Sequence, residues 1–200
     1  DAEYDKLVVE LRQIETDPLI SKTCPALARA ASKVASYPIR WMGTLGGNLC
    51  QETMCWYYNQ SHFWRKSLGW CMKKGSDYCH VAPGLGKCVA VFSSDPVPAM
   101  IAYGATVTLL SPDGERTIAL ADLYRDDGIH FLKLRPNEIV VSARLPVPPA
   151  GTRATHKKMR KRESIDYPIA NCSARVTLAE DGTVGDCAIV LGAVASAPVV

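Results

Sequence analysis

The sequence predicts an α+β fold in which short helices come first and antiparallel strands follow. Three observations predict it. Helical signals occupy the chain up to Tyr37, residues 50–92 show neither helical nor strand periodicity, and β-type runs separated by turn residues fill most of the remainder. With 48% hydrophobic and 22% charged residues, 200 residues can bury the core of one compact domain or two small ones.

The helical signals are amphipathic periodicity and capping residues. The first segment is YDKLVVELRQI, and it leads to TDPLI, where Thr16 or Asp17 can cap a helix whose first turn accepts Pro18. A second helix is expected over CPALARAASKVAS, ending before Tyr37-Pro38. The next stretch, RWMGTLGGNLC, is glycine-rich and is expected to be a loop.

Regular structure is expected to resume after the aperiodic stretch. A short helix should follow Pro98, and strands are expected over residues 105–110 and 116–120 around a Pro-Asp-Gly turn. Further strands are NEIVVSARLPV, the basic THKKMRKR, and a pair in IANCSARVTLAEDGTVGDCAIVLGAV with its turn at Asp181-Gly182.

The charge and the hydrophobic pattern argue against nucleic acids and membranes as partners. A formal net charge of +3 is too mild for a nucleic-acid-binding domain. The sequence has no apolar run of about 20 residues that could span a bilayer and no charged-then-apolar leader, so we expect a cytoplasmic protein. Because the chain begins without Met inside a helical pattern, we expect a fragment, a processed chain or one piece of a larger subunit.

Four of the eight cysteines lie in the aperiodic stretch. Cys55, Cys71, Cys79 and Cys88 are separated by 15, 7 and 8 residues, and seven of the chain's fifteen aromatic residues lie between the first and the last. Four thiolates can saturate an iron–sulfur cluster, which would organise a segment that lacks regular structure. The spacing alone also admits buried, incidental cysteines or a structural zinc site, although zinc modules usually contain a C-x2-C pair and none occurs here.

The other possible ligands are interpreted more simply. His62 and His80 could replace a thiolate, but we expect both to be solvated or hydrogen-bonded. Cys50 lies at the mouth of the segment and would be a ligand if one of the four is not. Three more cysteines are expected to be ordinary core residues, namely Cys24, Cys172 and Cys187.

The segment GTLGGN, residues 43–48, can bring backbone amides together without side-chain obstruction, as phosphate and flavin contacts require. Such a loop is often only a turn. Together with ASYPIRWMGTLGGNL, SSDPVPAMIAYGATVTLL, NEIVVSARLPVPP and KKMRKRESIDYPIANCSARV, however, it resembles the FAD-binding subunits of the xanthine dehydrogenase and carbon monoxide dehydrogenase family. The resemblance covers nearly the whole chain.

The resemblance implies an FAD-binding domain of the CO dehydrogenase flavoprotein type, with an antiparallel sheet and flanking helices. In that family the glycine loop is soon followed by Ser-Asp-Pro, whereas here Asn48 and Asp95 are 47 positions apart. The excess is an insertion of about 40 residues, long for a structureless loop. It divides the chain into residues 1–48, the insertion at 49–92, and residues 93–200, which would contain the rest of the domain and the start of a C-terminal region. The family's N-terminal FAD subdomain and its C-terminal domain would lie outside this chain, which alone should hold half of a flavin site.

Within the family, the insertion resembles the extra loop that carries a 4Fe–4S cluster in the beta subunit of 4-hydroxybenzoyl-CoA reductases. This resemblance implies that Cys55, Cys71, Cys79 and Cys88 are the cluster ligands and that Cys50 is not. Family resemblance also implies the FAD contacts. These are Thr44, Gly46, Gly47 and Asn48, with Asp95 at the adenosine or ribityl side, Val140 near the ring system and Lys158 near the isoalloxazine.

The implied function is electron transfer, with no catalytic residue on this chain. Electrons from a ferredoxin-like donor would pass through the 4Fe–4S cluster and FAD to 2Fe–2S and molybdenum centres in two partner subunits, in a dimer of heterotrimers. There the phenolic hydroxyl of an aromatic CoA thioester would be removed, under anaerobic conditions. Two other functions stay open: the flavin subunit of a xanthine dehydrogenase-like hydroxylase, and a zinc-stabilised interaction domain without redox activity.

Overall fold

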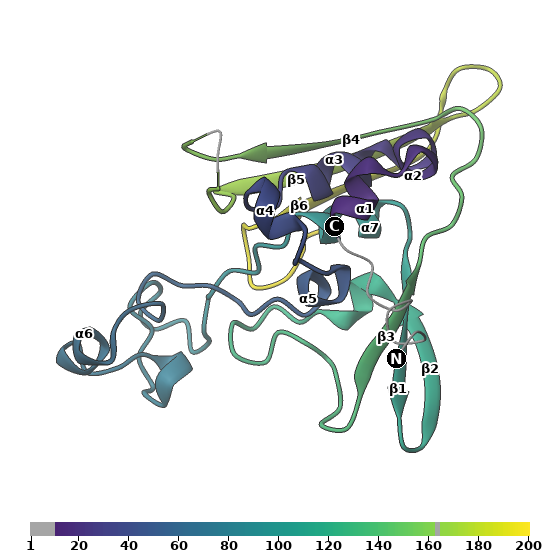
Figure 1. Ribbon diagram of the computed structural model, residues 1–200. Coiled ribbons are helices and arrows are strands. Elements are labelled where there is room, and N and C mark those ends of the chain that lie inside the picture. The colour runs from purple at the N-terminus through teal and green to yellow at the C-terminus, as the bar shows by residue number, and fades with distance from the viewer. Residues whose placement is uncertain (1–10, 163–164) are drawn as a thin grey trace.

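The computed structural model describes residues 11–162 and 165–200. Within them the chain forms two antiparallel three-stranded sheets, a set of short helices and an irregular segment that projects from the body of the molecule (Figure 1). The architecture is the α+β arrangement expected from the order of helical and strand signals.

The first sheet has the order β2-β1-β3. Its strands are β1 (Thr106–Ser111), β2 (Gly114–Ala119) and β3 (Ile139–Arg144). Pro112 and Asp113 form the turn between β1 and β2, and Gly114 has φ 118°, a left-handed value that favours glycine. Val107 and Leu109 point into the core from β1. The predicted hairpin and third strand are confirmed.

The second sheet has the order β4-β5-β6. It contains β4 (Thr152–Met159), β5 (Ala170–Leu178) and β6 (Val184–Gly192). The turn between β5 and β6 contains Asp181 and Gly182, with φ 82° at the glycine, as the sequence predicts.

Helices α1 (Leu11–Thr16), α2 (Pro18–Thr23) and α3 (Pro25–Ser32) form a layer over the second sheet (Figure 1). The Oδ1 atom of Asp17 accepts hydrogen bonds from the amides of Leu19 and Ile20 at 2.7 and 3.0 Å, so Asp17 caps α2 as expected. Most of the first predicted amphipathic segment lies outside the described residues. The helix at Pro25 ends at Ser32, several residues before Tyr37.

The glycine-rich stretch differs from the sequence expectation, because part of it is helical. Helix α4 (Tyr37–Arg40) precedes it, and α5 (Leu45–Leu49) includes two of its glycines. Thr44 caps α5 by accepting a hydrogen bond from the Gly47 amide at 3.0 Å. A capped single turn can form without helical periodicity in the sequence, and this explains the wrong prediction of a loop.

Helix α7 (Pro96–Ala102) lies at the centre of the fold, and all of its residues are buried. It packs against α3, α5, β5, β6 and the short 3₁₀ helix η2 (Leu120–Leu123). Phe92, just before α7, packs against Tyr124 and Phe131 with ring centroids 4.8 and 6.1 Å away. The segment between the insertion and β1 is therefore fixed in the core.

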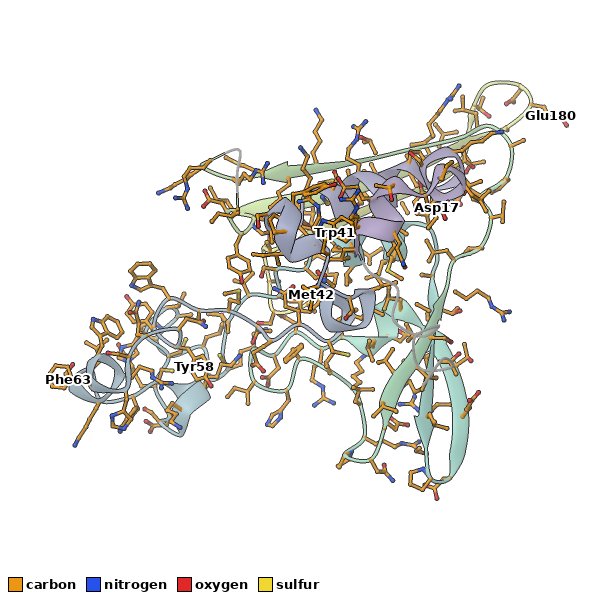
Figure 2. The ribbon with its side chains drawn as sticks, viewed as in Figure 1. Asp17, Trp41, Met42, Tyr58, Phe63 and Glu180 are labelled. Atoms are coloured by element: carbon orange, nitrogen blue, oxygen red, sulfur yellow. The ribbon has the colours of Figure 1, made fainter. Side chains whose placement is uncertain are left out.

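The insertion begins and ends at one antiparallel bridge. The amides of Met54 and Val91 donate to each other's carbonyl oxygens at 2.8 Å, and we call this bridge the neck. Beyond the neck the chain is irregular except for α6 (His62–Ser67) and the 3₁₀ turn η1 (Met72–Lys74), which confirms the predicted lack of regular structure. Figure 2 shows Phe63 of α6 at the outer end of the insertion, and its side chain is 82% exposed.

Candidate functional site

The four cysteines of the insertion surround one cavity, which we call the cysteine cavity. Cys55, Cys71, Cys79 and Cys88 all line it. Three of the thiols are buried, Cys55 is half-buried, and all four are free. In the part of the chain that the structure describes, no three His, Cys, Asp or Glu side chains are grouped to hold a single metal ion. The four cysteines instead line one shared cavity.

Local backbone structure brings these cysteines together. The neck places Cys55 and Cys88 at the same end of the insertion, one on each of its two limbs. Gly69 and Trp70 have φ values of 80° and 69°, so two successive left-handed residues turn the chain immediately before Cys71. The Met72 amide then donates to the Tyr78 carbonyl at 2.8 Å, which holds the segments of Cys71 and Cys79 side by side.

Aromatic rings form a small packed layer behind the cavity. The His80 ring stacks on Tyr57 at a centroid distance of 5.1 Å and meets the edge of Tyr78 at 5.0 Å. A ring nitrogen of His80, Nε2, is hydrogen-bonded to the Trp70 carbonyl at 2.7 Å. His62 is exposed and contacts the Trp70 ring edge at 5.2 Å. Although His80 also lines the cavity, the prediction that both histidines are hydrogen-bonded or solvated is confirmed.

The Cys88 limb rests on a loop of the main body, far away in the sequence. The Gly128 amide donates to the Cys88 carbonyl at 2.9 Å, and the Gly128 carbonyl accepts from Thr53 Oγ1 at 2.5 Å. A Cβ atom at position 128 would lie 2.7 Å from Cys88 Sγ and 2.6 Å from the Ala90 amide nitrogen. Only glycine fits this close approach.

The electrostatic surroundings of Cys88 combine opposing effects. Burial raises the pKa of its thiol above the ordinary value, and the neighbouring Cys79 and Cys55 thiols act in the same direction. A hydrogen bond from the Ala90 backbone and the positive charge of Lys73 lower that pKa in part. The Cys55, Cys79 and Cys88 thiols are therefore close enough to interact electrostatically.

A second hollow lies between the glycine-rich stretch and β4, and we call it the Asp95 cleft. Its volume is about 390 Å³. Four of the predicted FAD-contacting residues line it, namely Gly47, Asn48, Asp95 and Lys158. They come from α5, from the residue just before α7 and from β4. The fold thus brings together positions that are more than 100 residues apart in the sequence.

A buried polar network forms one side of this cleft. Lys158 Nζ lies 2.7 Å from Asp95 Oδ2 and donates to the Lys33 carbonyl at 2.9 Å, while Asn171 Nδ2 donates to Asp95 Oδ1 at 3.1 Å. Burial raises the pKa of Asp95, and the Lys158 charge and the Asn171 hydrogen bond oppose that rise. Within the described residues, Ser94 Oγ and Asn171 Oδ1 are buried without a hydrogen-bond partner. Neither residue lines the cleft, whose polar side is formed by Asp95 and Lys158.

Three predicted contact residues do not line the Asp95 cleft. Thr44 caps α5 through its hydroxyl, and Gly46 lies on the same turn. Val140 lies on β3, opposite Leu109 of β1, and packs against the hydrophobic core. Their contact with FAD stays a prediction.

Other cleft residues were missed by sequence reasoning. Gln51, Ser93 and Tyr167 line the Asp95 cleft. Ser93 and Tyr167 also line a neighbouring open groove, as do Cys55 and Trp56, and we call it the Trp56 groove. Because Cys55 lines the cysteine cavity as well, the cavity, the groove and the cleft adjoin one another through shared residues. The segment KKMRKRESIDYPIANCSARV, which carries part of the family resemblance, contains Tyr167 and could have pointed to it.

The remaining cysteines follow the sequence expectation only in part. Cys24 is buried and Cys172 is half-buried, but Cys187 on β6 is exposed, so its prediction as a core residue is wrong. Along β6, Val190 and Gly192 are buried on one face, and Cys187 lies on the opposite face with the exposed Ile189 and Leu191. Cys50 packs against the hydrophobic core and does not line the cysteine cavity, in agreement with its exclusion.

An antiparallel α+β fold with a large, mainly apolar cleft that contains a few polar groups beside a glycine turn is typical of a cofactor-binding domain. Comparison with known proteins identifies its class, because residues 8–148 match the family described as FAD binding domain in molybdopterin dehydrogenase. The chain belongs to this family of FAD-binding domains of molybdenum-containing oxidoreductases.

Among curated proteins, the chain is 34% identical over 181 residues to the aldehyde oxidoreductase FAD-binding subunit PaoB of Escherichia coli, covering 86% of this chain and 55% of that protein. It is 29% identical over 165 residues to the carbon monoxide dehydrogenase medium chain of Afipia carboxidovorans, covering 82% and 43%. The chain therefore spans about half the length of the curated relatives it matches.

Solved structures share the fold at low identity. Carbon monoxide dehydrogenase from Hydrogenophaga pseudoflava matches with a TM-score of 0.70 and 21% identity, over 96% of this chain and 52% of that one. Quinoline 2-oxidoreductase from Pseudomonas putida 86 matches with a TM-score of 0.66 and 21% identity, over 95% and 51%. Among the described residues, no helix is both long and apolar enough to cross a membrane.

Proposed function

We propose that this chain is the FAD- and 4Fe–4S-binding part of an electron-transfer subunit in a molybdenum-containing oxidoreductase. The observation that carries the proposal is the gathering of four free cysteines around one cavity, which adjoins the Asp95 cleft through the Trp56 groove. Four thiolates are the usual ligand set of a 4Fe–4S cluster, and the donor set of this cavity fits that group.

The Asp95 cleft is the proposed FAD site of this chain. Gly47 and Asn48 would present the helix turn α5 to the cofactor, while Asp95 and Lys158 form the polar side opposite. Thr44, Gly46 and Val140 belong to the proposed contact set through family resemblance. Tyr167 is added to it because its ring lies at the boundary between the cleft and the Trp56 groove.

When bound, FAD would exchange electrons singly or in pairs and the cluster would exchange them one at a time. The task of this chain would be to hold the two groups at a fixed separation and to exclude water around the buried thiols. We infer that electrons from a low-potential, ferredoxin-like donor arrive at the insertion and leave through the cleft toward 2Fe–2S and molybdenum centres on partner subunits. The proposed overall reaction is that of 4-hydroxybenzoyl-CoA reductase, the reductive removal of a phenolic hydroxyl from an aromatic CoA thioester.

A second candidate is the flavin subunit of a hydroxylating dehydrogenase. It is favoured by the relatives, which include a putative xanthine dehydrogenase FAD-binding subunit of Escherichia coli, 23% identical over 190 residues. The two candidates share the flavin site and differ in substrate and direction of electron flow. Assay of the assembled enzyme with an aromatic CoA thioester and with a purine distinguishes them.

The cluster is tested by metal analysis of the full chain after anaerobic reconstitution with iron and sulfide. We expect about four irons and four acid-labile sulfides per chain, with a broad absorbance near ~400 nm that bleaches on reduction by dithionite. Bound zinc without iron would contradict the cluster and favour the zinc-stabilised domain.

The ligand set is tested by single substitutions. Cys55→Ser, Cys71→Ser, Cys79→Ser and Cys88→Ser should each lower the iron content below that of the wild type, because each thiol lines the cavity. Cys50→Ser and Cys187→Ser are matched controls outside the cavity and should keep full iron. Full iron content in Cys71→Ser would show that the ligand assignment is wrong even if a cluster is present.

The FAD site is tested by fluorescence titration of FAD with the full chain. Asn48→Ala should weaken binding on the order of tenfold, the effect of losing one good hydrogen bond. Asn137→Ala, at an exposed asparagine before β3, is the matched control and should leave the affinity unchanged. Equal effects of the two substitutions would show that the cleft is not the FAD site.

A further inference from the structure

Lys73 is a buried cation at the edge of the cysteine cavity. It lies in η1, two residues after Cys71, and its side chain is only 6% exposed. It lines the cavity together with the four cysteines. A buried ammonium is unfavourable unless it is paired and hydrogen-bonded, so its surroundings show what holds it there.

The Lys73 ammonium is held by groups on both sides of the neck. It donates to the Thr53 carbonyl at 2.9 Å, to Thr53 Oγ1 at 2.5 Å and to the Gly128 carbonyl at 3.0 Å. Its counterion is Glu52, whose Oε1 lies 2.5 Å away, and its Nζ lies 5.1 Å from the centre of the Tyr58 ring. Tyr58 is labelled on the insertion in Figure 2. With this many partners the position of the charge is fixed.

The negative charge of Glu52 does not cancel the electric field of the Lys73 ammonium at the cysteine cavity. The carboxylate side chain of Glu52 is 65% exposed and is screened by water, whereas the ammonium is almost fully enclosed. Glu52 does not line the cavity, and Lys73 does. The cavity therefore experiences a net positive field from a rigidly placed charge.

We propose that Lys73 is a positioning residue that raises the reduction potential of the cluster held by the four cysteines, and that Glu52 opposes this effect. The inference rests on the proposed function. Reduction adds one negative charge to a cluster, and a fixed cation nearby stabilises the reduced state more than the oxidised one. The contacts of Lys73 with Thr53 and Gly128 keep that cation at a constant place between the insertion and the main body.

The proposal is tested by redox titration of the anaerobically reconstituted full chain, with the reduced cluster measured by electron paramagnetic resonance. In Lys73→Met the ratio of reduced to oxidised cluster at a fixed potential should fall on the order of tenfold, equivalent to about 59 mV for one electron. Lys73→Arg keeps the charge and should remain near the wild type. Lys74→Met removes an exposed charge one residue away and is the matched control, expected to be unchanged.

The counterion gives an opposite and independent readout. Glu52→Gln keeps the ammonium and should shift the same ratio upward, while Asp77→Asn, at an exposed carboxylate of the insertion, should not. A purely structural role of Lys73 would not produce shifts of opposite sign in these two variants. If Lys73→Met does not retain iron, the comparison of Glu52→Gln with Asp77→Asn shows whether the local charge sets the reduction potential.

Two results would overturn the inference in different ways. Equal shifts in Lys73→Met and Lys74→Met, or no shift in Glu52→Gln, would show that the placement of the charge is irrelevant while the cluster itself is present. A wild-type chain that takes up no iron would instead remove the proposed function and this inference with it.

Discussion

Lys158 Nζ and Asp95 Oδ2 lie 2.7 Å apart, and both side chains are almost completely buried, 3% and 5% exposed. The pair joins β4 to the start of α7, so it connects the second sheet with the central helix. It also forms one side of the Asp95 cleft. Removal of either charge leaves the other buried, and this relationship yields the first prediction.

Asp95→Asn should lower the free energy of unfolding by about 3 kcal/mol, because an uncompensated buried ammonium remains. Asp95→Asn with Lys158→Met should be less destabilised than the sum of the two single variants. Urea unfolding of the four proteins measures the coupling. Strictly additive effects would show that the two side chains act independently.

His156 should make stability depend on pH. It is 1% exposed, Nδ1 is hydrogen-bonded to Ser173 Oγ at 2.9 Å, and Nε2 has no partner among the described residues. Burial, followed by the charges of Lys158, Arg29 and Lys33, lowers its pKa from 6.5 to about 4. The unfolded chain thus binds a proton between these two pH values and the folded chain does not.

The stabilisation is present in full above pH 6.5 and is lost as the pH falls toward 4, and the total loss is about 3 kcal/mol. Urea unfolding at a series of pH values measures this slope. His156→Phe fills the same buried site without a titrating group and should flatten it. An unchanged slope in His156→Phe would assign the pH dependence to other groups.

Gly128→Ala should disturb the insertion and spare the cleft. The added Cβ would meet the Ala90 amide nitrogen at 2.6 Å and Cys88 Sγ at 2.7 Å, contacts that force the Cys88 limb to move. The cost of such overpacking is about 1–3 kcal/mol, and iron content should fall while FAD affinity is kept. Gly86→Ala, a loop glycine of the insertion at φ 71° with open space around its Cβ, is a control for backbone strain alone. Equal iron content in the two variants would show that the close contact of Gly128 with the Cys88 limb does not matter for the cluster.

Asp17→Ala should destabilise the chain by about 1 kcal/mol, because the Leu19 and Ile20 amides lose their acceptor. Asp17→Ser keeps a capping oxygen and should recover most of the loss. Thermal unfolding is sufficient to measure the difference. Equal melting temperatures of the Asp17→Ala variant and the wild type would show that α2 does not depend on its cap.

The parts of the fold that the sequence predicted are those specified by local chemistry. Asp17 with Pro18, and Asp181 with Gly182, define a helix start and a hairpin turn within a few residues, and the structure confirms both. The helix at Leu45 was not predicted, because three glycines conceal a single turn that depends on the Thr44 cap. Burial of Cys187 was predicted wrongly, since strand periodicity does not tell which face of an edge strand is covered.

The candidate sites also contain residues that the sequence predicted and residues that it did not. The cysteine set was found from composition and resemblance, and the structure shows that its members share one cavity. The roles of Lys73 and Gly128 depend on contacts across 55 residues of sequence, which no local pattern contains. Tyr167 and Ser93 were missed because a site built from loop residues has no periodic signature.

The neck at Met54 and Val91 has a practical consequence. Since these two residues are hydrogen-bonded neighbours, a tight turn of a few residues could join them without displacing the segment that leads to α7. The insertion also contacts the main body, because Gly128 is hydrogen-bonded to Cys88 and to Lys73, so its removal would expose the loop that contains Gly128. For an engineer, the same geometry marks where the segment could be shortened, provided that the Gly128 loop is redesigned with it.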